Sequence, residues 1–152
     1  MDLYSSPYTK AMNWALRYVN EVKNNRINRS CLLIINILYW TGMRIGEVMA
    51  LRSKDITNGV IHVTRSVMSI NKTITTPKTR SSIRDISISK TLQTEIVEFI
   101  QKIPYYDEED LLFGVSAFSV SNFLTKICKN ADVPQIRVHD LRHSHASFLI
   151  ER

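Results

Sequence analysis

The sequence predicts a mainly α-helical domain that carries a small three-stranded antiparallel sheet, an α+β fold. Two observations indicate this fold. Apolar residues recur at helical spacing toward both ends of the chain, and the middle contains three short alternating runs rich in β-branched side chains. The chain has 152 residues, of which 44% are hydrophobic and 22% charged. These values fit one folded domain over residues 1–152 with a single core.

The first part of the chain is expected to hold three helices. Residues 8–23 have amphipathic spacing, and a second helix over about residues 28–40 is apolar nearly all round, as is typical of a central buried helix. Gly42 then supplies a helix stop. A short third helix covers about residues 45–52.

The middle of the chain is predicted to form strands over residues 60–65, 73–76 and 83–88. Pro77 and Lys78 lie between the last two, which fits a loop at the tip of a sheet. Helices resume over about residues 90–102, 115–130 and from 139 onward.

Basic residues concentrate in the predicted sheet. The whole chain has a formal net charge of +6, and residues 62–90 contain six basic side chains against a single acid, Asp85. Many serine and threonine hydroxyls, which hydrogen-bond phosphate and sugar well, lie among them. For such a run alone, a solvated polar sheet face is the alternative to a nucleic-acid contact. The candidate DNA-binding residues are Arg65, Lys72, Arg80 and Arg84.

No segment indicates a membrane or secreted protein. The longest apolar stretch, residues 31–40, is interrupted by Asn36 and far too short to span a bilayer, and the N-terminus lacks the features of a signal peptide. We therefore expect a cytoplasmic protein without a membrane partner. Cys31 and Cys128 lack metal-type spacing and are expected to be free, mostly buried thiols. The aromatic pair Tyr39-Trp40 is assigned to the core.

Four side chains suit phosphoryl transfer without a metal. Arg44 stands at the junction of two predicted helices, His139 and Arg142 share one face of another, and Lys78 lies at the sheet tip. Guanidiniums neutralise the non-bridging oxygens of a phosphate with bidentate geometry. A lysine or histidine can exchange a proton with the attacking or leaving oxygen.

Each of these residues also has a plainer interpretation. Arg44 alone would be a salt-bridge partner, for example of Glu47. Lys78 alone would be an exposed loop lysine, and Arg80 is the alternative candidate for its role. Three histidines near the end of the sequence suggest a zinc site. However, no carboxylate or thiolate at usable spacing completes such a site, and an arginine among the histidines would repel a dication. These histidines are His139, His143 and His145.

Three motifs resemble those of the tyrosine recombinase (phage integrase) family. Residues 41–47 (TGMRIGE), followed by residues 50–52 (ALR), are similar to the family's first arginine box. Residues 77–79 (PKT), with Ser82, Arg84 and Ile86 after them, are similar to its β-hairpin lysine segment. Residues 139–144 (HDLRHS) are similar to the start of its second box. The order and separations also match, so the resemblance covers roughly residues 28–152, while residues 1–25 match poorly.

The resemblance implies a role for each matching residue. Arg44 and Arg142 would hold the scissile phosphate, and Lys78 would protonate the leaving 5′-oxygen. His139 would assist proton transfer, and Glu47 would support the site without reacting. Double-stranded DNA is the implied partner, and other recombinase protomers are a further candidate. No metal or nucleotide cofactor is implied.

One feature of the family has no counterpart in this chain. Family members continue past the second box to the tyrosine that attacks DNA, whereas all six tyrosines here precede His139. We therefore expect a catalytic domain truncated before its nucleophile, which binds DNA but cleaves nothing alone. The alternative is a non-catalytic DNA-binding module that regulates or competes with an intact recombinase. The tyrosines are Tyr4, Tyr8, Tyr18, Tyr39, Tyr105 and Tyr106.

Overall fold

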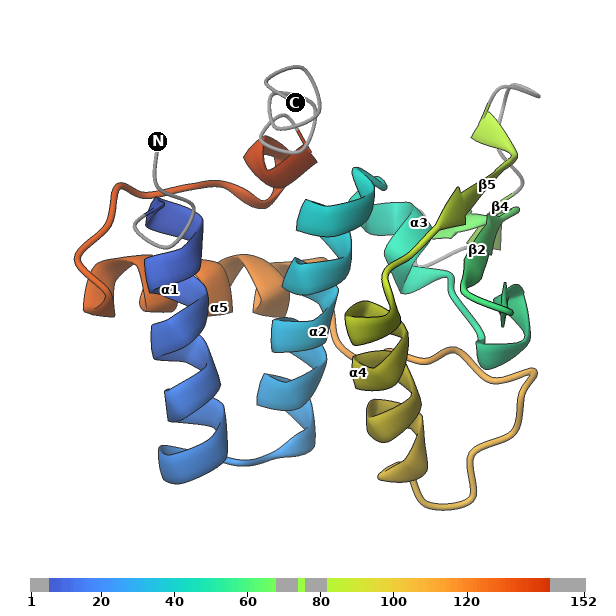
Figure 1. Ribbon diagram of the computed structural model, residues 1–152, viewed down its shortest axis with the longest axis horizontal. Helices are drawn as coiled ribbons and strands as arrows, with labels where there is room; N and C mark the ends of the chain where they lie inside the picture. The colour runs from blue at the N-terminus through green and yellow to red at the C-terminus, as the bar shows by residue number, and fades with distance from the viewer. Residues whose placement is uncertain (1–5, 68–73, 76–81, 143–152) are drawn as a thin grey trace.

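Helices α1, α2 and α4 run side by side, and α5 crosses behind α1 and α2 (Figure 1). The computed structural model describes residues 6–67, 74–75 and 82–142. Residues 138–142, which follow α5, are helical and lie beside the end of α2 (Figure 1). The principal helices are α1 (Pro7–Arg17), α2 (Arg26–Thr41), α3 (Ile45–Met49), α4 (Lys90–Gln101) and α5 (Ala117–Asn130).

The four long helices begin in the same way. Each starts at a serine or asparagine whose side chain accepts a hydrogen bond from the backbone N–H three residues later, which satisfies a group that the helix leaves unpaired. These local signals explain why the predicted helices form where the sequence places them. The N-caps and their donors are Ser6 with Thr9 (3.1 Å), Asn25 with Asn28 (2.9 Å), Ser89 with Leu92 (3.2 Å) and Ser116 with Ser119 (3.1 Å).

The three-stranded antiparallel sheet is confirmed, and two of its strands fall within the expected segments 60–65 and 83–88, whereas the third was not expected. Its order is β1 (Ile56–Thr57), β2 (Val60–Val63) and β5 (Arg84–Ser87). The predicted middle strand instead contributes β4 (Ile74–Thr75), which pairs with β3 (Ser66–Val67) in a separate ribbon. Strands of two residues carry almost no periodic signal, so tertiary pairing decides where they form.

The register of the sheet determines which side chains face the helices. Val63 lies opposite Arg84, and Ile61 lies opposite Ile86. Ile61 and Val63 are fully buried, so alternation along β5 turns Arg84 and Ile86 toward the protein and Asp85 away from it.

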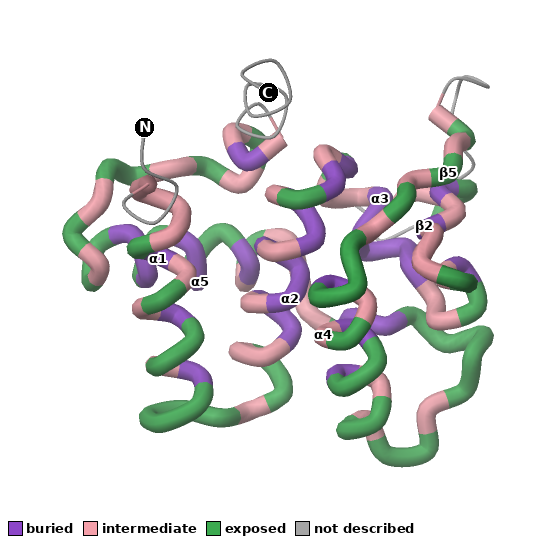
Figure 2. The backbone as a smooth tube through the Cα atoms, viewed as in Figure 1, coloured by how far each residue is buried: buried purple, intermediate pink, exposed green. Residues whose placement is uncertain are grey.

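Helix α2 is the centre of the core, as its all-round apolar pattern predicts. Figure 2 shows it buried along most of its length, between α1, α4 and α5. The assignment of Tyr39-Trp40 to the core is wrong for Trp40, whose surface is 48% exposed, while Tyr39 is half-buried and stacks on Tyr8. Trp40 lies where α2 nears its end and is no longer covered on all sides.

Other differences concern the ends of elements and their environment. The first helix closes with a π-helical turn at Tyr18–Val22, and α3 is shorter than expected because a 3-10 turn, Ser53–Asp55, follows it. Cys31 and Cys128 are free and buried, as predicted. Among the described residues, no helix is long and apolar enough to cross a membrane.

Candidate phosphate-binding site

The site begins where α2 ends. Gly42 adopts the left-handed conformation (φ 71°) and its N–H bonds the carbonyl of Leu38 at 3.0 Å, which closes the helix in a way that favours glycine. This turn buries Met43 and brings Arg44 to the N-cap of α3 with its side chain 53% exposed. A buried scaffold therefore presents an exposed guanidinium.

Helix α3 is fixed at its start by Glu47. The Glu47 carboxylate accepts a hydrogen bond of 2.9 Å from the backbone N–H of Arg44, so the acid three residues into the helix satisfies the cap position. The same arrangement of an arginine with an acid three residues later opens two further helical turns. These pairs are Arg52 with Asp55 (2.9 Å) and Arg137 with Asp140 (3.2 Å).

Glu47 also pairs with Arg84 from strand β5. The Arg84 guanidinium donates to both carboxylate oxygens, at 2.9 and 3.0 Å, and the Arg44 guanidinium lies 3.8 Å from the same carboxylate. Burial alone would raise the pKa of Glu47, whose side chain is only 3% exposed. The hydrogen bonds from Arg84 and Arg44 and the two positive charges bring this pKa below its ordinary value. Glu47 is therefore ionised at neutral pH.

Arg142 comes to the same place from the far end of the chain. It lies on the helix over residues 138–142, which Leu141 anchors in the core with 1% exposure. Burial and the charge of Arg44 lower the pKa of Arg142, Glu47 opposes them, and Arg84 adds a further lowering. The guanidinium remains protonated all the same. The guanidiniums of Arg44, Arg84 and Arg142 and the Glu47 carboxylate together carry a charge of +2 (three minus one), which an anion would partly neutralise.

A pocket of about 560 Å³ opens between α2, α5 and residues 138–142. Arg44, His139 and Arg142 line it, and we call it the arginine pocket. Three of the four predicted catalytic residues thus share one cavity, although nearly 100 residues of chain separate Arg44 from the other two. The rest of the lining is Leu38, Met43, Ile45, Ala117, Phe118, Ser121 and Val138.

Other predicted site residues lie elsewhere. Arg65 donates a hydrogen bond of 2.8 Å to the carbonyl of Ala50 and lies 3.9 Å from Asp55. With Arg84 paired to Glu47, both predicted DNA-binding residues that the structure describes, Arg65 and Arg84, bond within the protein, and a direct contact with DNA stays a prediction for them. Lys72, Lys78, Arg80, His143 and His145 lie outside the described residues.

Sequence reasoning missed Phe118 and Ser121 in the pocket wall. A signal for Phe118 was present. The apolar stripe of α5 runs through Val120, Phe123, Leu124 and Ile127, and Phe118 falls on the opposite face, where a large aromatic residue has no place in the core.

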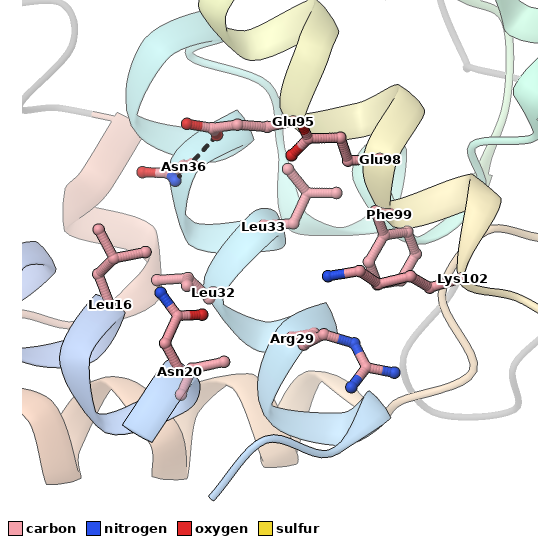
Figure 3. A pocket seen from close by; sticks show the side chains of 11 residues that line it. Leu16, Asn20, Arg29, Leu32, Leu33, Asn36, Glu95, Glu98, Phe99 and Lys102 are labelled. Carbon is pink, nitrogen blue, oxygen red and sulfur yellow. Dashed lines mark hydrogen bonds between the residues drawn. The ribbon is translucent and has the colours of Figure 1, made fainter. Parts of the chain in front are cut away.

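A second pocket lies at the other side of α2. Figure 3 shows it between α1, α2 and α4, where leucine side chains meet Arg29, Lys102, Glu95 and Glu98. Its volume is about 160 Å³, and both acidic and basic side chains are spread along it. The titratable side chains that line the arginine pocket are Arg44, His139 and Arg142, none of which is acidic. We therefore place the functional site at the arginine pocket.

A mainly helical domain that holds one arginine from the junction of α2 and α3 and another from residues 138–142 at one pocket has the architecture of a tyrosine recombinase catalytic domain. The model of the Phage integrase family matches residues 10–152. The chain therefore belongs to the phage integrase family, and the resemblance of its motifs is confirmed.

Relatives and solved structures agree with this assignment. The chain is 32% identical over 133 residues to the ICEBs1 integrase of Bacillus subtilis, covering 76% of this chain and 36% of that protein. It is 36% identical over 119 residues to a putative prophage phiRv2 integrase of Mycobacterium tuberculosis, covering 70% and 32% respectively. The chain thus spans about a third of the length of these relatives.

The fold is that of two solved integrases. The Tn1549 transposon integrase, in complex with transposon right end DNA, superposes with a TM-score of 0.75 at 20% identity, over 96% of this chain and 52% of that one. The lambda integrase catalytic core superposes with a TM-score of 0.59 at 14% identity, over 97% and 81%.

Proposed function

We propose that this chain binds double-stranded DNA and holds one backbone phosphate in the arginine pocket, as part of the active site of a site-specific recombinase. The observation that carries the proposal is that Arg44, His139 and Arg142 line one pocket, while a single carboxylate, Glu47, offsets the charges of Arg44 and Arg84 beside it. Such an excess of positive charge costs free energy in the empty protein and is relieved when an anion binds.

Within this proposal, the arginines divide into two groups. Arg44 and Arg142 line the pocket and hold the non-bridging oxygens of the phosphate, which planar guanidiniums do with two parallel hydrogen bonds. Arg84 does not line the pocket and acts through Glu47, which it holds in place. His139 lines the pocket and assists proton transfer or orients the phosphate.

Several observations support DNA as the ligand. The chain has a net charge of +6, and the segment of residues 62–90 carries most of this excess. The curated relatives include integrases, and the Tn1549 integrase was solved in complex with transposon right end DNA. Lys78 would deliver a proton to the leaving 5′-oxygen, as its match to the family motif implies.

The reaction of the whole protein would be strand breakage and rejoining through a phosphotyrosine. A tyrosine hydroxyl would lose its proton to a base as its oxygen attacks the phosphorus, the bond to the 5′-oxygen would break, and that oxygen would take up a proton from an acid. Among the described residues, no tyrosine lines the arginine pocket. We therefore propose that the 152 residues alone bind the phosphate without forming the covalent bond.

A binding titration tests the DNA assignment. Fluorescence anisotropy with a labelled duplex at several salt concentrations should give a log affinity that falls linearly with log salt, with a slope of about −0.9 per phosphate neutralised. A salt-independent signal, or no binding at low salt, would refute the proposal.

The chemical step has its own test. Incubation of the chain with nicked duplexes that carry an integrase attachment site should give no protein–DNA adduct after denaturing electrophoresis. A stable adduct on this chain would show that it contains a working nucleophile and would disprove the second part of the proposal.

A further inference from the structure

Phe118 is an aromatic residue without a place in the core. It lies in the first turn of α5, and its side chain is 73% exposed. The positions that bury α5, such as Val120 and Leu124, are on the other side of the helix. An exposed phenylalanine adds nothing to the packing of this helix and exposes apolar surface to water.

The surroundings of Phe118 are those of the arginine pocket. It lines the cavity with Arg44, His139 and Arg142, and the remaining wall is largely apolar, with contributions from Met43 and Val138. A site for a free phosphate would be lined by polar groups throughout. In duplex DNA, however, each phosphate is joined to two nucleosides, whose deoxyribose rings present an apolar edge beside the charge.

We propose that Phe118 is a positioning residue whose ring packs against the nucleoside next to the phosphate held by Arg44 and Arg142. The inference rests on the proposed DNA function and adds a contact with the nucleoside. Because the base faces of a duplex are stacked on one another, the ring meets the apolar edge of the deoxyribose, which is the same at every nucleotide. The contact therefore tolerates any sequence and fixes the orientation of the strand in the pocket. Electrostatic attraction brings the DNA to the arginine pocket, and the Phe118 ring fixes the orientation of the bound strand.

Binding to a labelled duplex separates this contact from charge effects. Phe118→Ala should weaken the affinity roughly 5- to 30-fold, the fold-change that corresponds to the loss of about 1–2 kcal/mol of apolar burial. The salt dependence should keep its slope because no charge is removed. Phe118→Trp should restore the affinity. Tyr105→Ala is the matched control, since Tyr105 is an exposed aromatic residue (102%) that does not line the pocket.

A spectroscopic readout distinguishes direct contact from a structural effect. The emission of the new tryptophan in Phe118→Trp, above the background of Trp14 and Trp40, should be quenched by the duplex and unchanged by inorganic pyrophosphate. Tyr105→Trp should respond to neither ligand. Thermal unfolding of Phe118→Ala should match that of the parent chain, as expected for an exposed side chain.

The outcomes separate the two proposals. If the parent chain binds the duplex with the expected salt dependence but Phe118→Ala binds equally well, the nucleoside contact is refuted and the DNA function stands. Quenching of Phe118→Trp by pyrophosphate as strongly as by the duplex would also overturn the contact. If the parent chain does not bind the duplex, both proposals fall.

Discussion

Arg84 donates two hydrogen bonds to Glu47, one to each carboxylate oxygen, and so joins strand β5 to helix α3. The same carboxylate caps α3 through the backbone of Arg44. One buried acid thereby sets the positions of a pocket arginine, a helix and a sheet strand. Because β5 follows the segment that contains Lys78 in the sequence, the pair also fixes the chain at one end of that segment.

Removing the Glu47 charge should destabilise the fold. In Glu47→Gln, Arg84 loses its ionic partner, and the positive charges of Arg44 and Arg84 are no longer offset by a carboxylate. We expect a loss of roughly 3 kcal/mol, the lower part of the range for breaking a buried pair, because Arg84 is 28% exposed. Urea unfolding at pH 7 measures this loss.

The same pair predicts the response to acid. The pKa of Glu47 is lowered in the folded state, so its contribution is present above the unfolded value and is lost as the pH falls through the folded value. The stability of the parent chain should therefore drop more steeply below about pH 4.5 than that of Glu47→Gln. Asp85→Asn, on the same strand with a 69% exposed side chain, should change stability by less than about 1 kcal/mol. Equal effects of both variants would contradict a special role for Glu47.

Loss of Arg142 should weaken DNA binding more than loss of a distant arginine. Arg142→Ala removes a guanidinium from the pocket, and we expect at least about a tenfold loss of affinity with a salt slope reduced by about 0.9. Arg26→Ala removes the same charge from the other end of α2 and should have a smaller effect. If the two variants lose affinity equally, DNA binding depends on net charge and not on the pocket.

Gly46 should not tolerate a side chain. A Cβ atom there would lie 2.5 Å from the hydroxyl of Ser66 and 2.8 Å from the carbonyl oxygen of Val67, so α3 would have to move off strand β3. Gly46→Ala should cost about 1–3 kcal/mol by overpacking. Gly114→Ala, where no atom lies within 4 Å of the added Cβ, should be nearly neutral. Thermal unfolding of the two variants compares them, and similar melting temperatures would show that the α3–β3 contact can adjust.

The two cysteines should be inert in the folded protein. Burial raises the pKa of the Cys31 thiol to about 11, and both thiols are inaccessible to solvent. Since the thiolate is the reactive form, an aromatic disulfide reagent at pH 8 should label neither cysteine in the native chain and both in urea. The variants Cys31→Ala and Cys128→Ala would show which cysteine is responsible for any residual labelling of the native chain. Rapid labelling of the native parent chain would show that the core around α2 opens readily.

Much of this fold could be predicted because its signals are local. The serine and asparagine N-caps and the apolar faces of α2 and α5 lie within single segments, and the predicted helices are accordingly present. The pairing of β3 with β4 was not predictable, since two-residue strands are selected by the tertiary structure. The partner of Arg84 required the sheet register, which the sequence does not fix without the neighbouring strands.

The arginine pocket was predictable only through the resemblance to the family. Composition and spacing single out Arg44 and Arg142, but no local pattern brings together two residues that lie nearly 100 positions apart in the sequence. The structure places both, with His139, on one cavity. Their roles in holding a phosphate remain predictions, as does that of Lys78.

Glu95 should make the stability of the fold depend on pH in the opposite sense to Glu47. It lines the second pocket, between α1, α2 and α4, where it accepts a hydrogen bond of 3.3 Å from Asn36 (Figure 3). The Tyr8 hydroxyl donates in turn to the carboxamide oxygen of Asn36. Burial raises the pKa of Glu95, the bond from Asn36 partly offsets this, and the charge of Glu98 raises it further. The folded protein therefore holds this proton more tightly than the unfolded chain does.

A carboxyl group whose pKa is raised by folding lowers the free energy of unfolding as the pH rises from its unfolded pKa to its folded pKa. Above this range the folded protein has to hold a partly buried carboxylate. Glu95→Gln keeps the acceptor for Asn36 and removes the charge, so it should be more stable than the parent chain at pH 7, by up to about 1 kcal/mol, and equal to it near pH 3. Glu21→Gln, at an exposed position of the π-helical turn, should match the parent chain at both pH values. A destabilised Glu95→Gln at pH 7 would mean that the ionised carboxylate is a net stabilising partner of the cations in the groove, Arg29 and Lys102.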